Sequence, residues 1–186
     1  MLGKTFLVEP EVINVRNLAQ IAEYATGVVY IHAAPVALCP HVEWALSSTL
    51  NVRAQLKWSP QDAEPGMQRA TADWVGPAGT AARLVTALRE WSSLRFEVTE
   101  DPGEGVDGLR FSYVPGLGLW HGSTAANGDV ILGEMQIRAL MDAQPDGRGL
   151  AGELNAALGT AWDNELENYR LGSVGAEATW LAQRVG

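Results

Sequence analysis

The chain has 186 residues, of which 47% are hydrophobic, and it carries 13 basic against 22 acidic side chains for a net charge of −9. This length and apolar content predict one folded domain with an elaboration, and the acidic excess argues against a nucleic-acid or anionic-membrane partner. The single cysteine, Cys39, excludes an internal disulfide and a multi-cysteine zinc site. Since no apolar run approaches the ~20 residues of a membrane span and no secretory signal pattern is present, we expect a cytoplasmic protein.

Residues 1–26 are predicted to be an N-terminal extension. A short helix over residues 11–24 is favoured by apolar residues that recur at helical spacing: Leu18, Ile21, Ala22 and Ala25. Residues 6–8 could alternatively add an edge strand to a sheet.

Residues 27–100 show a β-α-β-β-α-β pattern. The predicted strands cover residues 27–33, 52–58, 69–75 and 94–99, and the predicted helices cover residues 40–50 and 77–91. Because each helix has one apolar stripe that must be buried, we expect both helices to pack on one face of a mostly antiparallel sheet. This predicts the α+β class with a ferredoxin-like core.

The polar rows of these strands form a second candidate surface. They are Arg53, Gln55 and Lys57, then Arg69, Thr71 and Asp73, then Arg95, Glu97 and Thr99. Strict alternation predicts that they point away from the helices. They could form a recognition face, for example in a homodimer, unless the C-terminal region covers them.

Residues 101–186 are predicted to form a β-hairpin and helices that pack on the first unit in one compact domain. The hairpin strands are expected at 109–114 and 117–124, with Pro115-Gly116 as the turn, followed by a turn at 127–129 and helices at 134–143, 150–158 and 162–169. Residues 178–185 could be a final strand or a short helix.

The densest group of reactive side chains is His32, Cys39, His41 and Glu43. A cysteine at a helix N-terminus can have a lowered pKa, and either histidine could act as its base, so Cys39, His41 and His32 are candidate catalytic residues. Imidazole and thiolate also bind zinc, with His121 as a further ligand, although the spacing matches no known zinc motif. Alternatively, His32 is a hydrogen-bonded residue at a strand end and His41 and Glu43 belong to a solvated helical turn. From the sequence we assign no catalytic residue, no metal and no cofactor.

Two further groups could contribute to binding. Trp120 and His121, on the second hairpin strand, could border a pocket. The acidic residues Asp163, Glu165 and Glu167 favour a solvated helix face over an acid/base pair.

The chain resembles an uncharacterised family of high-GC Gram-positive bacteria that is catalogued as a domain of unknown function, DUF3145. The resemblance lies in four motifs and one pattern: His32-Ala-Ala-Pro35, Leu38-Cys39-Pro40-His41-Val42-Glu43-Trp44-Ala45, Gly76-Pro77-Ala78-Gly79-Thr80-Ala81-Ala82-Arg83-Leu84, Leu94-Arg95-Phe96-Glu97-Val98-Thr99-Glu100 and Trp162-Asp163-x-Glu165-Leu166-Glu167. It implies a cytoplasmic setting and transfers no catalytic residue.

The leading hypothesis is a cytoplasmic, non-enzymatic protein that binds a small ligand or a protein partner, the partner including a second copy of itself. The alternative is a small enzyme or metal-binding protein that uses the His32, Cys39, His41 and Glu43 cluster. The candidate ligand-binding residues are His32, Cys39, His41, Glu43, Trp120 and His121.

Overall fold

The computed structural model describes residues 24–144, 146–171 and 178–181. In chain order its elements are β1 (Tyr24–Pro35), a 3₁₀ turn (Val36–Leu38), α2 (Cys39–Leu50), β2 (Ser59–Pro60), β3 (Met67–Pro77), α3 (Thr80–Leu88), β4 (Arg95–Glu100), β5 (Gly108–Val114), β6 (Gly118–Thr124), β7 (Val130–Ile131), α4 (Glu134–Ala143), α5 (Leu150–Leu158), α6 (Thr160–Leu171) and β8 (Ala178–Leu181). This is an α+β protein. The helix predicted over residues 11–24 lies outside the described residues, except that Tyr24 begins β1.

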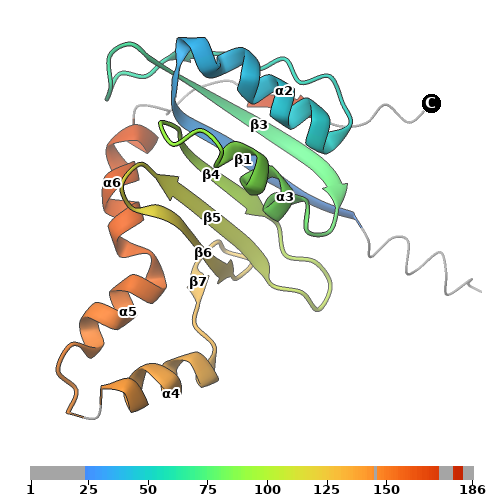
Figure 1. The fold of residues 1–186 in the computed structure, drawn as a ribbon. Helices are drawn as coiled ribbons and strands as arrows, with labels where there is room; N and C mark the ends of the chain where they lie inside the picture. Colours follow the sequence, from blue (N-terminus) through green and yellow to red (C-terminus); the bar gives the residue numbers. More distant parts are fainter. Residues whose placement is uncertain (1–23, 145, 172–177, 182–186) are drawn as a thin grey trace, which may run out of the picture.

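The strands form one eight-stranded sheet with the order β2-β3-β1-β4-β5-β6-β7, and β8 pairs with β3 (Figure 1). All neighbours are antiparallel except β3 and β8, which are parallel. The sheet therefore continues past the four predicted strands, through β5, β6 and β7 on the β4 side. The register of β1 shifts near His32 against both β3 and β4, which marks a local irregularity at that residue.

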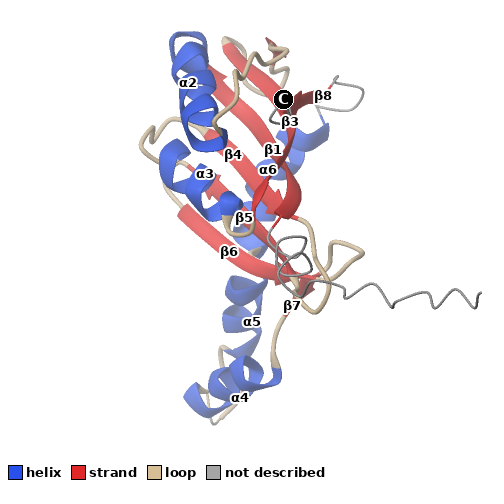
Figure 2. Cartoon of the chain, turned by 90° about the vertical axis from the view of Figure 1, so that its right-hand side faces the viewer, coloured by secondary structure: helices blue, strands red, loops and turns tan. Residues whose placement is uncertain are grey.

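Helices α2 and α3 pack on one face of the sheet, as the alternating pattern predicts (Figure 2). The apolar rows of β1, β3 and β4 meet the apolar stripes of the two helices in one core. Its largest fully buried members include Trp74, Phe96, Ile31, Leu46, Leu84 and Leu88. Burying each large apolar side chain stabilises the fold by about 1.5–3 kcal/mol relative to exposure, so this face carries most of the hydrophobic stabilisation.

The prediction of a strand over residues 52–58 is wrong. Within residues 52–60, only Ser59–Pro60 pairs with β3. The alternation of burial persists, with Ala54 and Leu56 buried. However, side chains of α2 bind the backbone here: Ser47 Oγ accepts the Ala54 N–H at 2.9 Å and Glu43 Oε1 accepts the Leu56 N–H at 2.8 Å. The segment is half-buried, and its backbone N–H groups bind side chains: those of α2 and, at Lys57, the Thr179 hydroxyl of β8 at 3.2 Å.

The sheet has a helix on its second face as well. Helix α6 packs there against β1 and β5, behind the sheet in Figure 2, so helices do not lie on one face only. The strand alternation predicts that Glu97 points away from α2 and α3, on a face that the C-terminal region could cover. It does point away from α2 and α3, and it is 5% exposed because α6 covers it. The C-terminal region thus covers part of the predicted polar recognition face.

The C-terminal predictions are largely confirmed. The hairpin turns at Pro115-Gly116, where Gly116 has a φ of 85° and the Leu117 N–H donates to Val114 O at 3.2 Å. Helices α4 and α5 have the predicted bounds, α6 contains the predicted 162–169 helix, and β8 is the strand alternative for residues 178–181. Helices α4 and α5 extend away from the sheet as a helical hairpin (Figure 1). None of the helices in the described parts of the chain has both the length and the apolar content of a membrane span.

Candidate functional site

Cys39 begins α2 but lacks the features of an activated thiol. The side chain is 8% exposed, and Sγ donates to Pro35 O at 3.7 Å. Burial, together with the nearby Glu43 carboxylate, raises the pKa of the Cys39 thiol. A raised pKa suppresses the thiolate, which is the nucleophilic and metal-binding form. This is the opposite of the lowering expected at a helix N-terminus.

The other members of the predicted cluster each have a separate role. Glu43 accepts the Trp58 indole N–H at 3.0 Å in addition to the Leu56 N–H. His41 is exposed, and its ring lies 6.3 Å from the Trp91 ring. His32 is buried and donates from Nε2 to Glu97 Oε2 at 2.7 Å. No hydrogen bond joins any two of His32, Cys39, His41 and Glu43; each has a partner outside the group or faces solvent.

His121 cannot complete this cluster. It lies on β6, three strands from β1, a separation of ~14 Å at normal strand spacing. Its ring contacts Phe111 on the α2 and α3 side, whereas His32 faces Glu97 on the α6 side. In the described residues, no three His, Cys, Asp or Glu side chains are placed to hold a metal ion.

The thiol offers a direct check of this interpretation. We expect native Cys39 to react with a soluble disulfide reagent at pH 8 about tenfold or more slowly than the same thiol in urea-unfolded protein, because it is buried and its pKa is raised. Cys39 is the only cysteine, so the absorbance change reports this residue alone. Equal rates in the two states would restore the nucleophile hypothesis.

The best-connected buried group is Glu97. It lies on β4, opposite Tyr30 of β1 and Ser112 of β5, on the face that α6 covers. Arg170 of α6 donates to Glu97 through Nε at 2.9 Å and Nη2 at 2.6 Å. Ser112 Oγ donates at 3.0 Å, in addition to the His32 bond. One carboxylate therefore joins β1, β4 and β5 to α6.

Burial alone would raise the pKa of Glu97, but hydrogen bonds and charge from His32 and Arg170 outweigh it and hold the pKa well below its usual range. The same pairing, with Asp163, raises the pKa of Arg170 despite its partial burial. A carboxylate held this firmly in its charged form is a poor general acid or base. We interpret Glu97 as a structural clamp for α6.

Further polar contacts secure α6 at both ends. At its start, Asp163 accepts from Arg110 of β5 at 3.1 Å and from Arg170 at 2.8 Å. At its end, the Tyr169 hydroxyl donates to Glu64 at 2.8 Å, and the Arg95 guanidinium lies 4.8 Å from the Tyr169 ring centre. Leu166 fills the apolar centre of this contact and is 0% exposed.

Trp120 connects the sheet to the helical hairpin. It is 7% exposed, its indole N–H donates to Ala157 O of α5 at 3.3 Å, and Arg110 lies 5.0 Å from its ring centre. Gly159, which joins α5 to α6, packs against the same ring. Trp120 thus anchors the base of α5.

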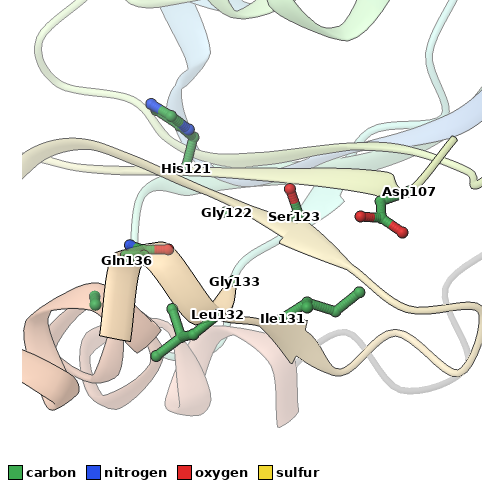
Figure 3. A pocket seen from close by; sticks show the side chains of 9 residues that line it. Asp107, His121, Gly122, Ser123, Ile131, Leu132, Gly133 and Gln136 are labelled. Atoms are coloured by element: carbon green, nitrogen blue, oxygen red, sulfur yellow. The ribbon is translucent and has the colours of Figure 1, made fainter. Parts of the chain in front are cut away.

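His121, in contrast, does line a cavity. This cavity has a volume of about 270 Å³ and lies between β6, the end of β7 and the base of the α4–α5 hairpin (Figure 3). Its polar lining is Asp107, His121, Ser123 and Gln136, and Ile131 and Leu132 supply apolar side chains.

The α4–α5 hairpin exposes large apolar side chains. Neither helix contains a buried residue. The exposed fractions are 75% for Met135, 38% for Ile137, 54% for Met141 and 36% for Leu158. Ile137 and Met141 share one face of α4, whereas Met135 lies about 200° around the helix from Ile137. We call Ile137, Met141 and Leu158 the hairpin apolar surface. Apolar groups gathered on a projecting element indicate an interaction surface.

The comparison with family models matches residues 28–183 to the protein family of unknown function DUF3145. The chain belongs to the DUF3145 family. The match begins in β1 and ends beyond β8, so it includes both the sheet and the helical hairpin. No curated protein and no solved structure gives a significant match.

Sequence reasoning missed the two features that organise this DUF3145 protein. The alternation of β4 places Glu97 on the face that the C-terminal region could cover, but nothing local shows that α6 is the covering element or that Arg170 pairs with Glu97. The apolar side chains of α4 were visible in the sequence. Their amphipathic spacing, however, is the same in a helix packed on a core and in one that projects from it.

Proposed function

We propose that this protein is a non-enzymatic binding protein whose docking element is the α4–α5 hairpin. The observation that carries the proposal is the hairpin apolar surface of Ile137, Met141 and Leu158 on two helices without a buried residue. Methionine side chains adapt to irregular partner surfaces, which suits this role. The Glu97 clamp fixes α6, and Trp120 fixes the base of α5, so the hairpin is presented in a defined direction.

The chemistry of the predicted cluster supports a binding role over catalysis. Cys39 is buried with a raised thiol pKa, and His32 is bound to a carboxylate held in its charged form. A single buried cysteine also suits the reducing cytoplasm, the location we propose. The low number of basic residues supports a protein partner over a nucleic acid.

The partner is proposed to be a protein segment that is both apolar and basic. Residues 134–171 contain seven acidic and three basic side chains. Each of the three arginines, Arg138, Arg148 and Arg170, already forms an ion pair with an acidic neighbour. Asp142, Glu153 and Glu165 have no ion pair in the described residues. Charge complementarity therefore favours a basic partner, and it disfavours a second copy of the same acidic hairpin.

The first part of the sheet supports a finer description of the fold. Strands β2, β3, β1 and β4 follow one another in the sheet, with α2 and α3 on one face. This is the order of a ferredoxin-like unit, and we propose that β5 to β8 and α4 to α6 are additions to it.

Photo-crosslinking tests the docking proposal. A benzophenone amino acid is placed at position 137, 139 or 141 of the full chain, which is produced in its native host cells and irradiated. We expect one discrete adduct from positions 137 and 141, whose exposed side chains lie four residues apart on one face of α4. Mass spectrometry should place the attachment in a segment that contains apolar residues and Lys or Arg. Met141→Glu should reduce adduct formation from position 137 about 30-fold, the loss of a strong interface contact.

Position 139 is the matched control, because it is exposed but lies about 200° around α4 from position 141. Ala139→Glu should leave the adduct from position 137 unchanged. An adduct with a second copy of the chain would replace the proposed partner by a homodimer. No discrete adduct, or equal adducts from positions 139 and 141, would refute docking on this surface.

A further inference from the structure

The cavity at the base of the hairpin contains polar side chains that the protein itself leaves without partners. Asp107, His121, Ser123 and Gln136 form no hydrogen bond or ion pair through their side chains within the described part of the chain, although all four line one cavity. Asp107, His121 and Gln136 are exposed, so these side chains are free to bind a ligand that enters the cavity.

The charge of the cavity lining favours a positively charged ligand. Asp107 is its one acidic residue, and neither Lys nor Arg lines the cavity. Ser123 pairs with Leu109, two residues after Asp107, so the hydroxyl and the carboxylate lie near the same end (Figure 3). Gln136 of α4 lines the cavity from the hairpin side. A planar group with several N–H donors could bind the Asp107 carboxylate in a bidentate manner and donate to the neighbouring oxygens.

The cavity is large enough for a side chain. Its volume of about 270 Å³ lies at the lower limit of the ~300–1,000 Å³ typical of small-molecule sites. Ile131 and Leu132 supply apolar contacts for the stem of such a side chain. An arginine side chain combines a planar cation with an apolar stem of this kind.

We infer that this cavity is a guanidinium-binding subsite that receives an arginine side chain of the partner docked on the hairpin. The inference rests on the proposed function, because the cavity is bounded by α4 and α5 and so adjoins the hairpin apolar surface. Apolar residues of the partner would lie on α4 while its arginine enters beside Asp107. The cavity then determines specificity, and the apolar surface supplies most of the contact area.

The subsite can be tested without knowledge of the partner. Ethylguanidinium chloride is titrated into isotopically labelled full-length protein, and backbone amide shifts are followed by NMR at constant ionic strength. We expect saturable shifts concentrated at Gly122, Ser123 and Gly133, which line the cavity. N-Ethylurea has nearly the same shape but no charge, and it should bind about tenfold or more weakly, since hydrogen bonds between charged groups are the stronger ones.

Asp107→Asn should weaken ethylguanidinium binding about tenfold or more. Glu104→Gln is the matched control, because it removes one exposed negative charge from the same loop without altering the cavity lining, and it should leave binding unchanged. No saturable shift at the cavity, equal binding of ethylurea, or binding indifferent to Asp107→Asn would overturn the inference. Ethylguanidinium binding and hairpin photo-crosslinking are separate measurements. The titration can refute the subsite without refuting docking, and the crosslinking can refute docking without refuting the subsite.

Discussion

Glu97→Gln is expected to lower the free energy of unfolding by about 3 kcal/mol, because it leaves the Arg170 guanidinium without its main counter-charge. The substitution keeps the shape of the side chain but removes its charge and one of two acceptor oxygens. The glutamine amide would then present N–H groups where Arg170 or His32 now donates. Arg170 is 28% exposed and keeps Asp163 as a partner, which places the expected loss at the lower end of the range for buried pairs.

Urea unfolding at pH 7, followed by tryptophan fluorescence, measures this loss. Glu167→Gln is the matched control, since Glu167 also faces Arg170 but lies 3.8 Å away and is 60% exposed. It should change the free energy of unfolding by less than about 0.5 kcal/mol. A similar small effect for Glu97→Gln would mean that α6 is held by its apolar contacts alone.

The clamp also predicts a pH dependence. The pKa of Glu97 is lowered in the folded protein, whereas in the unfolded chain it is about 4.3. The folded state therefore binds fewer protons below pH ~4.3, and the stabilisation, present in full above this pH, is lost as the pH falls toward the lower folded-state pKa. The difference in stability between wild type and Glu97→Gln should shrink between pH 6 and pH 3. A difference that stays constant with pH would contradict the assignment.

The local patterns in the sequence predicted most of the elements. The alternation in β1, β3 and β4 and the apolar stripes of α2 and α3 are set by neighbouring residues, and each has the expected buried face. The segment 52–58 shows the limit of this reasoning. Its alternating residues do become alternately buried, but Glu43 and Ser47 of α2 bind its backbone, and burial periodicity does not reveal which group provides the hydrogen bonds.

The candidate site was less predictable because it depends on contacts between distant residues. His32 and Glu97 are 65 residues apart, and Glu97 and Arg170 are 73 residues apart. Sequence proximity instead suggested that His32, Cys39, His41 and Glu43 act together, whereas each has its own partner or faces solvent. Of Trp120 and His121, the two candidate pocket residues on this hairpin strand, His121 lines the cavity. The return of α6 over the second face had no comparable local signal.

Gly159→Ala is expected to lower the free energy of unfolding by about 3 kcal/mol, through two additive costs. Gly159 has a φ of 78°, a left-handed conformation that costs a residue with a side chain about 1–2 kcal/mol. A methyl group there would also lie 2.6 Å from Cε2 of Trp120. The ring cannot move freely, because its N–H is bound to Ala157 O and Arg110 covers one face, so overpacking adds about 1–3 kcal/mol.

Gly149→Ala is the control that separates the cost of the left-handed backbone conformation from the cost of overpacking against Trp120. Gly149 lies at the other end of α5 with a φ of 85°, but the nearest atom to an added methyl group is Oε1 of the flexible Gln144 side chain, at 3.5 Å. It should therefore show only the conformational cost, about 1 kcal/mol in urea unfolding. If Gly159→Ala also displaces α5 from Trp120, tryptophan fluorescence of the folded protein should change in that variant and not in Gly149→Ala. Equal losses from both substitutions would show that Trp120 does not fix the hairpin, and the defined presentation of its apolar surface would then lack a structural cause.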